Sequence, residues 1–146
     1  MTQPRPIRVL FVCTGNSARS IMAEALLRRH GGERFEVHSA GTHPKGVNPL
    51  TLQVLGEAGI DASWARSKSV EDFLGQSFDY VITVCDQARE ACPVFPGAVG
   101  SLHWGYPDPA AASGTEEQRR LAFRQVLTAM GQRISRFANQ TERVTA

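Results

Sequence analysis

The chain has 146 residues, of which 42% are hydrophobic and 21% are charged, and its formal net charge is +2. This length suits one domain spanning residues 1–146, and the composition is that of an ordinary globular protein. The net charge is small and the basic residues are scattered, which argues against a partner such as nucleic acid or a membrane surface.

The ends of the chain and its cysteines indicate a cytoplasmic protein. The first six residues, Met-Thr-Gln-Pro-Arg-Pro, contain no apolar signal segment, and no apolar run approaches the ~18 residues of a spanning helix. The three cysteines, Cys13, Cys85 and Cys92, are an odd number without zinc-like spacing. We therefore expect reduced thiols, no bound metal and no closed disulfide framework.

Strands and helices alternate in the first part of the chain. Residues 7–12 form a nearly continuous apolar run, which is typical of a buried parallel strand. A helix is predicted from Ser17 to His30, with an apolar stripe and a stop at Gly31-Gly32. Residues 35–39 are predicted to form a second strand.

Capping signals mark the next helices. Asn48 is predicted to cap a helix that has Pro49 in its first turn. Leu52, Val54 and Leu55 of this helix are predicted to face inward. Ser69 to Asp72 resembles a capping box that opens a short helix.

The second half of the chain continues the alternation. Residues 78–84 are the strongest β-branched run and are predicted to form a central strand, and residues 99–104 a short edge strand. Thr115 to Gln118 is a second capping box and begins a long amphipathic helix. This order predicts an α/β fold with a parallel sheet covered by helices on both faces.

Three chemically interesting residues follow predicted strands. Cys13 comes after the first strand, Cys85 after the third, and Asp108 lies in the loop after the fourth. In parallel sheets, ligands bind beyond the carboxyl ends of the strands, so we expect these residues to converge at one edge.

The loop between the first strand and the first helix has the pattern Cys-x5-Arg. Unpaired N–H groups at a helix start, a flexible Gly15 and the planar guanidinium of Arg19 together favour a tetrahedral oxyanion. The same positive field should favour the thiolate of Cys13. The predicted oxyanion-binding residues are Thr14, Gly15, Asn16, Ser17, Ala18, Arg19 and Ser20. The alternative is that Cys13 is a small apolar residue ending a buried strand.

These residues resemble the low-molecular-weight tyrosine phosphatases over about residues 7 to 138. The loop, Met22-Ala23-Glu24, Ser39-Ala40-Gly41 and Asp108-Pro109 carry this resemblance. Within that family the chain looks more like the arsenate reductases, on the basis of Asn48-Pro49, Val84-Cys85-Asp86, Cys92-Pro93, Pro96, His103-Trp104 and Asp108-Pro109-Ala110. The resemblance implies a four-stranded parallel sheet.

Two departures from the family pattern modify this expectation. The phosphatases carry aromatic residues after the Asp-Pro pair, whereas residues 110–112 are alanines here. An aryl substrate would therefore lack the aromatic side chains that line its binding site in the phosphatases. Some arsenate reductases bind a monovalent cation through an acidic residue just past Trp64. The corresponding segment, residues 65–69, contains no carboxylate, so we expect no cation site.

The resemblance implies arsenate reduction by a cysteine relay that serves arsenic detoxification. Cys13 attacks arsenate with Asp108 as the acid, Cys85 resolves the adduct, and Cys92 carries the disulfide outward. No cofactor is expected to be bound. The reductant is thioredoxin, or glutathione with glutaredoxin, or another small thiol. Asp108 can also be a turn residue, and Cys85 and Cys92 can be packing groups.

Two other functions remain open at this point. The same loop suits a phosphomonoester or protein-tyrosine phosphatase, and we expect weak phosphatase activity in any case. A non-catalytic thiol redox sensor would need the loop but no acid.

Overall fold

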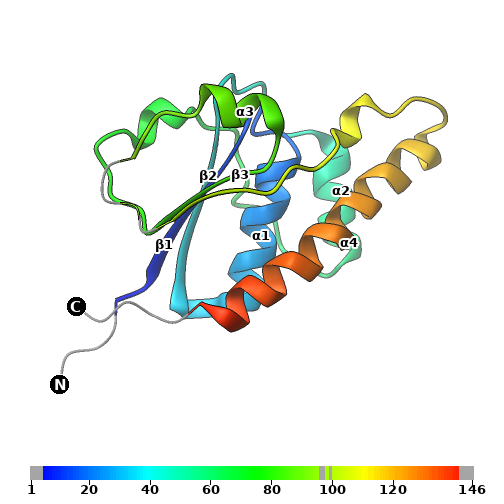
Figure 1. Ribbon diagram of the computed structural model, residues 1–146. Helices are drawn as coiled ribbons and strands as arrows, with labels where there is room; N and C mark the ends of the chain where they lie inside the picture. Colours follow the sequence, from blue (N-terminus) through cyan, green and yellow to red (C-terminus); the bar gives the residue numbers. More distant parts are fainter. Residues whose placement is uncertain (1–4, 96–97, 99, 142–146) are drawn as a thin grey trace.

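The strands form one parallel sheet in the order β2-β1-β3-β4, seen in a computed structural model that describes residues 5–95, 98 and 100–141 (Figure 1). The strands are β1 (Ile7–Cys13), β2 (Phe35–Gly41), β3 (Tyr80–Thr83) and β4 (Gly100–His103). Every pair of neighbours runs parallel. The predicted four-stranded parallel sheet is therefore confirmed.

Helices lie on both sides of this sheet. The α-helices are α1 (Arg19–Gly31), α2 (Pro49–Glu57), α3 (Asp86–Ala91) and α4 (Glu116–Gln140). Within the described residues, 3₁₀ helices span Gly32–Arg34, Val70–Phe73 and Pro109–Ala111. In Figure 1, α1, α2 and α4 form one layer, while α3 lies apart from them above the strand ends. Among the described residues, no helix is long and apolar enough to cross a membrane.

The predicted caps are present because they depend only on neighbouring residues. The side chain of Asn48 accepts a hydrogen bond from the N–H of Leu50, and Pro49 occupies the first turn of α2. Ser69 and Thr115 each form a complete capping box. The helix after Ser69 is a 3₁₀ helix.

Several predicted boundaries and one predicted face differ from the structure. Helix α1 begins at Arg19 rather than Ser17, because the preceding residues form the loop, and β3 is shorter than residues 78–84. Leu52 was expected to face inward, but it is 43% exposed, and Thr51 is buried in its place. The Thr51 hydroxyl donates to the Ser17 carbonyl, which turns this face of α2 toward the loop. Val99 and Pro96 lie outside the described residues.

Burial of the first strand and the first helix positions the loop between them. All of β1 is buried except Arg8, which is partly exposed. Helix α1 is buried over most of its first nine residues, because it lies between the sheet and α4. A rigid strand and a rigid helix therefore hold residues 13–19 from both ends.

Candidate active site

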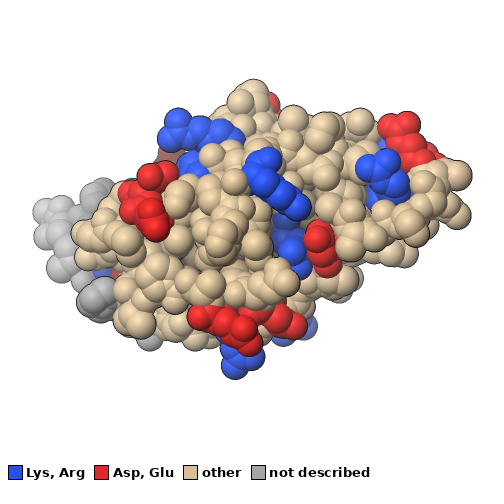
Figure 2. All heavy atoms as spheres, turned by 90° about the horizontal axis from the view of Figure 1, so that it is seen from above, with Lys and Arg blue, Asp and Glu red and all other residues tan. Residues whose placement is uncertain are grey.

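The loop formed by residues 13–18 lies at the carboxyl edge of the sheet, where β1 ends and α1 begins. This is the edge seen from above in Figure 2, where Lys and Arg side chains lie near the middle of the face. The first N–H groups of α1 have no partners within the helix and carry the positive end of its dipole. An anion at this edge is therefore favoured by the backbone itself.

The carbonyl groups of the loop point away from the cavity because a neighbouring segment binds them. The carbonyls of Cys13, Thr14, Gly15 and Ser17 accept hydrogen bonds of 2.8–3.0 Å from the backbone N–H groups of Thr42, His43, Lys45 and Asn48. In a trans peptide, the N–H points opposite to the carbonyl of the preceding residue. The N–H groups of residues 14, 15, 16 and 18 consequently face the other way, as a nest for an anion requires.

Asn16 holds the sharpest bend of the loop. Its φ is 45°, the left-handed conformation that asparagine tolerates better than most residues. Its buried side chain donates to the hydroxyls of Ser20 (2.7 Å) and Ser39 (3.1 Å) and accepts from the N–H of Lys68 (2.8 Å). The tight turn was expected at Gly15, but Gly15 has no positive φ. A Cβ there would instead lie 2.8 Å from Cε of Lys45.

The sulfur of Cys13 lies on the floor of this loop. The residue is 2% exposed, and its Sγ is 2.8 Å from the hydroxyl of Ser20 and 3.2 Å from the backbone nitrogen of Asn16. The N–H of Asn16 donates to this sulfur, and the Ser20 hydroxyl lies close enough to donate to it as well. These contacts favour a nucleophilic role for Cys13 over simple packing.

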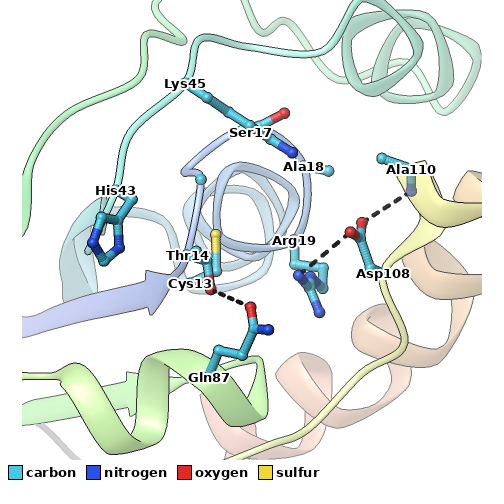
Figure 3. A pocket seen from close by; sticks show the side chains of 11 residues that line it. Cys13, Thr14, Ser17, Ala18, Arg19, His43, Lys45, Gln87, Asp108 and Ala110 are labelled. Atoms are coloured by element: carbon cyan, nitrogen blue, oxygen red, sulfur yellow. Dashed lines mark hydrogen bonds and ion pairs between the residues drawn. The ribbon is translucent and has the colours of Figure 1, made fainter.

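A cavity of about 270 Å³ opens above this sulfur (Figure 3). Its walls include the predicted Cys13, Arg19 and Asp108, and Ala110 from the predicted alanine segment, together with three residues that the sequence did not single out: His43, Lys45 and Gln87. His43 and Lys45 follow β2 at its carboxyl end, so their place in the topology could have indicated them. Gln87 carries no comparable signal in the sequence. Ala110 forms part of the cavity wall and contributes no aromatic ring to it.

Arg19 and Asp108 approach each other on one side of the cavity (Figure 3). One guanidinium nitrogen of Arg19 donates to the Tyr106 carbonyl at 3.0 Å, and another lies 4.0 Å from Oδ2 of Asp108. The other oxygen of Asp108, Oδ1, accepts from the N–H of Ala110 at 3.0 Å. Asp108 therefore caps a turn with one oxygen and presents the other toward the cavity side.

The second cysteine lies beside the loop, whereas the third lies farther along the chain. Cys85 is 3% exposed, and its Sγ is 3.3 Å from the hydroxyl of Thr14, which also contacts Gln87 at 3.4 Å. Cys92 is half-buried at the far end of α3, and burial raises the pKa of its thiol. All three cysteines are free. Cys85 thus contacts the loop residue next to Cys13, whereas Cys92 lies at the far end of α3.

A buried carboxylate supports the loop from behind. Glu24 is 2% exposed and accepts hydrogen bonds from the Ser39 hydroxyl (2.6 Å) and from Arg28 (2.5 Å). The ammonium of Lys68 lies 3.9 Å from the same carboxylate. Burial lowers the pKa of Lys68, and the charge of Glu24 opposes that shift. In the part of the chain that the structure describes, no cluster of three His, Cys, Asp or Glu residues suits a metal ion.

Comparisons with known proteins agree with this geometry. Residues 8–145 match the family model of the low molecular weight phosphotyrosine protein phosphatases. The arsenate reductase of Bacillus licheniformis is 42% identical over 134 residues, which cover 92% of this chain and 96% of the relative.

Solved structures show the same likeness. A thioredoxin-dependent arsenate reductase of Corynebacterium glutamicum has a TM-score of 0.73 and 31% identity, and the match covers 95% of this chain but only 63% of that one. An arsenate reductase in its oxidised state has a TM-score of 0.78 and 28% identity, with 91% and 97% covered. With its phosphatase-type loop and sheet, the chain belongs to the low molecular weight phosphotyrosine protein phosphatase family.

Proposed function

We propose that this protein reduces arsenate to arsenite, using Cys13 as the nucleophile and a thiol relay through Cys85 and Cys92. The observation that carries the proposal is the second thiol: Cys85 contacts Thr14, the loop residue next to Cys13. A phosphatase needs one cysteine in this loop, whereas reduction of an oxyanion needs two thiols that can join. The similarity to arsenate reductases supports the same assignment.

The first step is binding and attack. Arsenate occupies the N–H nest of residues 14–20, and Arg19 turns from the Tyr106 carbonyl to bind two of its oxygens. The Cys13 thiolate forms a bond to arsenic. Asp108 in its protonated form transfers a proton to the departing hydroxyl group of arsenate, which leaves as water.

The next steps move two electrons from sulfur to arsenic. Cys85 loses its proton and attacks the Cys13 sulfur, and the arsenic–sulfur bond breaks with its electron pair remaining on arsenic, so that arsenite leaves. Cys92 then attacks Cys85, which forms the Cys85–Cys92 disulfide and releases Cys13 as a thiolate. Two thiols are oxidised to one disulfide while As(V) becomes As(III).

An external thiol system must reduce this disulfide to complete the cycle. Thioredoxin is the first candidate because one related structure is described as thioredoxin-dependent, and glutathione with glutaredoxin or another small thiol is the second. Since the cycle depends on reduced thiols, we propose a cytoplasmic location. We further propose that residues 1–146 act as one domain that carries no bound cofactor or metal.

Weak phosphatase activity is a second proposed function of the same loop. A phosphomonoester would form a phosphocysteine at Cys13 that water then hydrolyses. Ala110 forms part of the cavity wall, so the cavity offers an aryl leaving group no aromatic partner at that position. We therefore propose that this activity is secondary.

Steady-state arsenate turnover tests the proposal when the reductant is varied. The purified protein is assayed with thioredoxin and its reductase, with glutathione and glutaredoxin, and with dithiothreitol, and arsenite is measured directly. We expect turnover with the thioredoxin system and none for Cys13→Ser. Absence of turnover with every reductant, together with reversible oxidation of Cys13, would favour a thiol redox sensor.

A further inference from the structure

A histidine on β4 bridges the sheet to the short helix that joins the two relay cysteines. The His103 ring lies 2.8 Å from the Thr83 hydroxyl through Nδ1 and 2.8 Å from Oδ1 of Asp86 through Nε2. A neutral ring satisfies both contacts, because Nε2–H donates to the carboxylate and Nδ1 accepts from the hydroxyl. Thr83 is the last residue of β3, and Asp86 is the first residue of α3.

The backbone at Gly105 packs closely against this bridge. A Cβ on Gly105 would lie 3.1 Å from Oδ1 of Asp86 and 3.2 Å from Nε2 of His103, so a larger residue there would require the pair to shift by a few tenths of an ångström. The N–H of Trp104 donates to the Thr83 carbonyl, and the N–H of Tyr106 donates to the Val84 carbonyl. The chain that follows His103 is thus tied to the segment that leads into Cys85.

The two ends of α3 are held very differently. In the first turn, Asp86 contacts His103, Gln87 contacts Thr14, and Ala88 is fully buried. Residues 89–91 are exposed, and no hydrogen bond joins their side chains to another residue that the structure describes. The first turn therefore belongs to the rigid part of the site, and the last turn can unwind at low cost.

The proposed relay requires the two ends of α3 to differ in this way. Cys85 and Cys92 are seven residues apart, and helical geometry separates such positions by roughly 10 Å, whereas a disulfide needs Cα atoms within ~7 Å. The last turn must therefore open. The first turn must stay in place at the same time, because Cys85 acts on Cys13 beside Thr14.

We propose that His103 is a positioning residue of the thiol relay, which anchors the first turn of α3 through Asp86 and so holds Cys85 at the loop. This inference rests on the proposed function, since it concerns the step in which Cys85 attacks Cys13. The Asp86 side chain is 90% exposed, so the contact is a modest one that controls geometry more than stability.

The test isolates that step in a Cys92→Ser background, where the reaction stops after one turnover. Arsenate is added without external reductant, and arsenite release and the Cys13–Cys85 disulfide are followed by rapid quench and mass spectrometry. His103→Ala and Asp86→Ala should each slow arsenite release about three- to ten-fold, the range that loss of one hydrogen bond produces. Asp86→Asn keeps the acceptor oxygen and should react like the parent. Glu90→Ala, on the exposed end of the same helix, is the matched control.

Three further measurements separate positioning from general damage. The double variant should be no slower than either single alanine variant, because both remove one interaction. Hydrolysis of p-nitrophenyl phosphate, which uses Cys13 without Cys85, should change less than arsenite release. In amide hydrogen exchange, residues 84–87 should lose protection in His103→Ala and keep it in Glu90→Ala.

The outcomes are distinguishable from failure of the relay itself. An unchanged rate in His103→Ala, additive effects in the double variant, or an equal loss of phosphatase activity would each overturn the anchoring role. If His103→Ala does not fold, the rate of arsenite release by Asp86→Ala decides whether the anchoring role holds, because the Asp86 side chain is exposed. Arsenite release at the parent rate by Cys85→Ser would instead disprove the proposed relay, whatever His103 does.

Discussion

The sulfur of Cys13 lies 2.8 Å from the hydroxyl of Ser20, the second residue of the helix that follows the loop. The backbone N–H of Asn16 is directed at the same sulfur from 3.2 Å. Helix α1 thus contributes a side chain, and the loop contributes a backbone donor, to a single atom. Both contacts favour negative charge on sulfur.

The first prediction concerns the reactivity of this sulfur. Iodoacetamide should alkylate Cys13 faster than Cys85 or Cys92 near neutral pH, because both the Asn16 N–H and the Ser20 hydroxyl lie beside the Cys13 sulfur, whereas Cys85 has the Thr14 hydroxyl and burial raises the pKa of Cys92. Phosphate or arsenate should protect it by filling the cavity. Peptide mapping by mass spectrometry measures all three rates, and equal rates would contradict the assignment. Ser20→Ala should slow the reaction at Cys13 alone.

The second prediction concerns the acid. Asp108→Asn keeps an oxygen for the Ala110 N–H but removes the transferable proton. Turnover of arsenate and of alkyl phosphates should fall by roughly 10²–10⁴-fold, whereas p-nitrophenyl phosphate, whose leaving group needs little protonation, should be less affected. Equal rates of arsenate turnover in the variant and the parent would restrict Asp108 to its capping role.

The third prediction concerns monovalent cations. The Lys68 ammonium lies 3.9 Å from the buried Glu24 carboxylate, so this place already holds a positive charge. A second cation is disfavoured beside it. Activity should therefore be the same in sodium and potassium salts at constant ionic strength. A several-fold activation by potassium alone would mean that other oxygens form a cation site.

The fourth prediction separates reductase from phosphatase. Cys85→Ser and Cys92→Ser should leave p-nitrophenyl phosphate hydrolysis nearly intact, because neither residue lines the cavity. Cys85→Ser should stop arsenate turnover, and Cys92→Ser should stop after about one turnover with Cys13 joined to Cys85. Mass spectrometry of the oxidised wild type should find the Cys85–Cys92 linkage. If both variants keep full turnover with glutathione and glutaredoxin, the external thiol resolves Cys13 directly.

The fifth prediction concerns stability. The nearly buried Asp79 carboxylate accepts two hydrogen bonds from Arg5, at 2.7 and 2.8 Å, and one from the N–H of Arg8 at 2.8 Å. The side-chain hydrogen bonds from Arg5 lower the pKa of Asp79. Asp79→Asn should therefore reduce the free energy of unfolding at pH 7 by roughly 1–3 kcal/mol.

The pH dependence of this effect follows from the direction of the shift. A lowered pKa in the folded state means stabilisation that is present above the unfolded pKa of about 3.9 and is lost as pH falls through the lower folded value. Urea unfolding of the parent and Asp79→Asn should thus give a difference that shrinks at acid pH. Glu90→Gln, on an exposed helix end, serves as the control. A difference that is constant with pH would assign the effect to packing.

The elements that depend on neighbouring residues could be predicted from the sequence. The apolar run of β1, the Cys-x5-Arg loop after it and the caps at Asn48, Ser69 and Thr115 all act over a few residues. Backbone dihedral angles and capping hydrogen bonds are decided at that range. The alternation of strands and helices then implied a parallel sheet with one functional edge.

Which distant residues meet at that edge was decided only by the tertiary structure. Thr14 and Cys85 are 71 positions apart, and their contact depends on β1 and β3 being neighbours in the register of the sheet. The outward face of Leu52, the approach of Lys68 to Glu24 and the bridge from His103 to Asp86 likewise depend on how distant elements pack. Local sequence determines which residues can do chemistry here, and strand order and packing determine which of them meet, because no short-range signal encodes contacts between residues far apart along the chain.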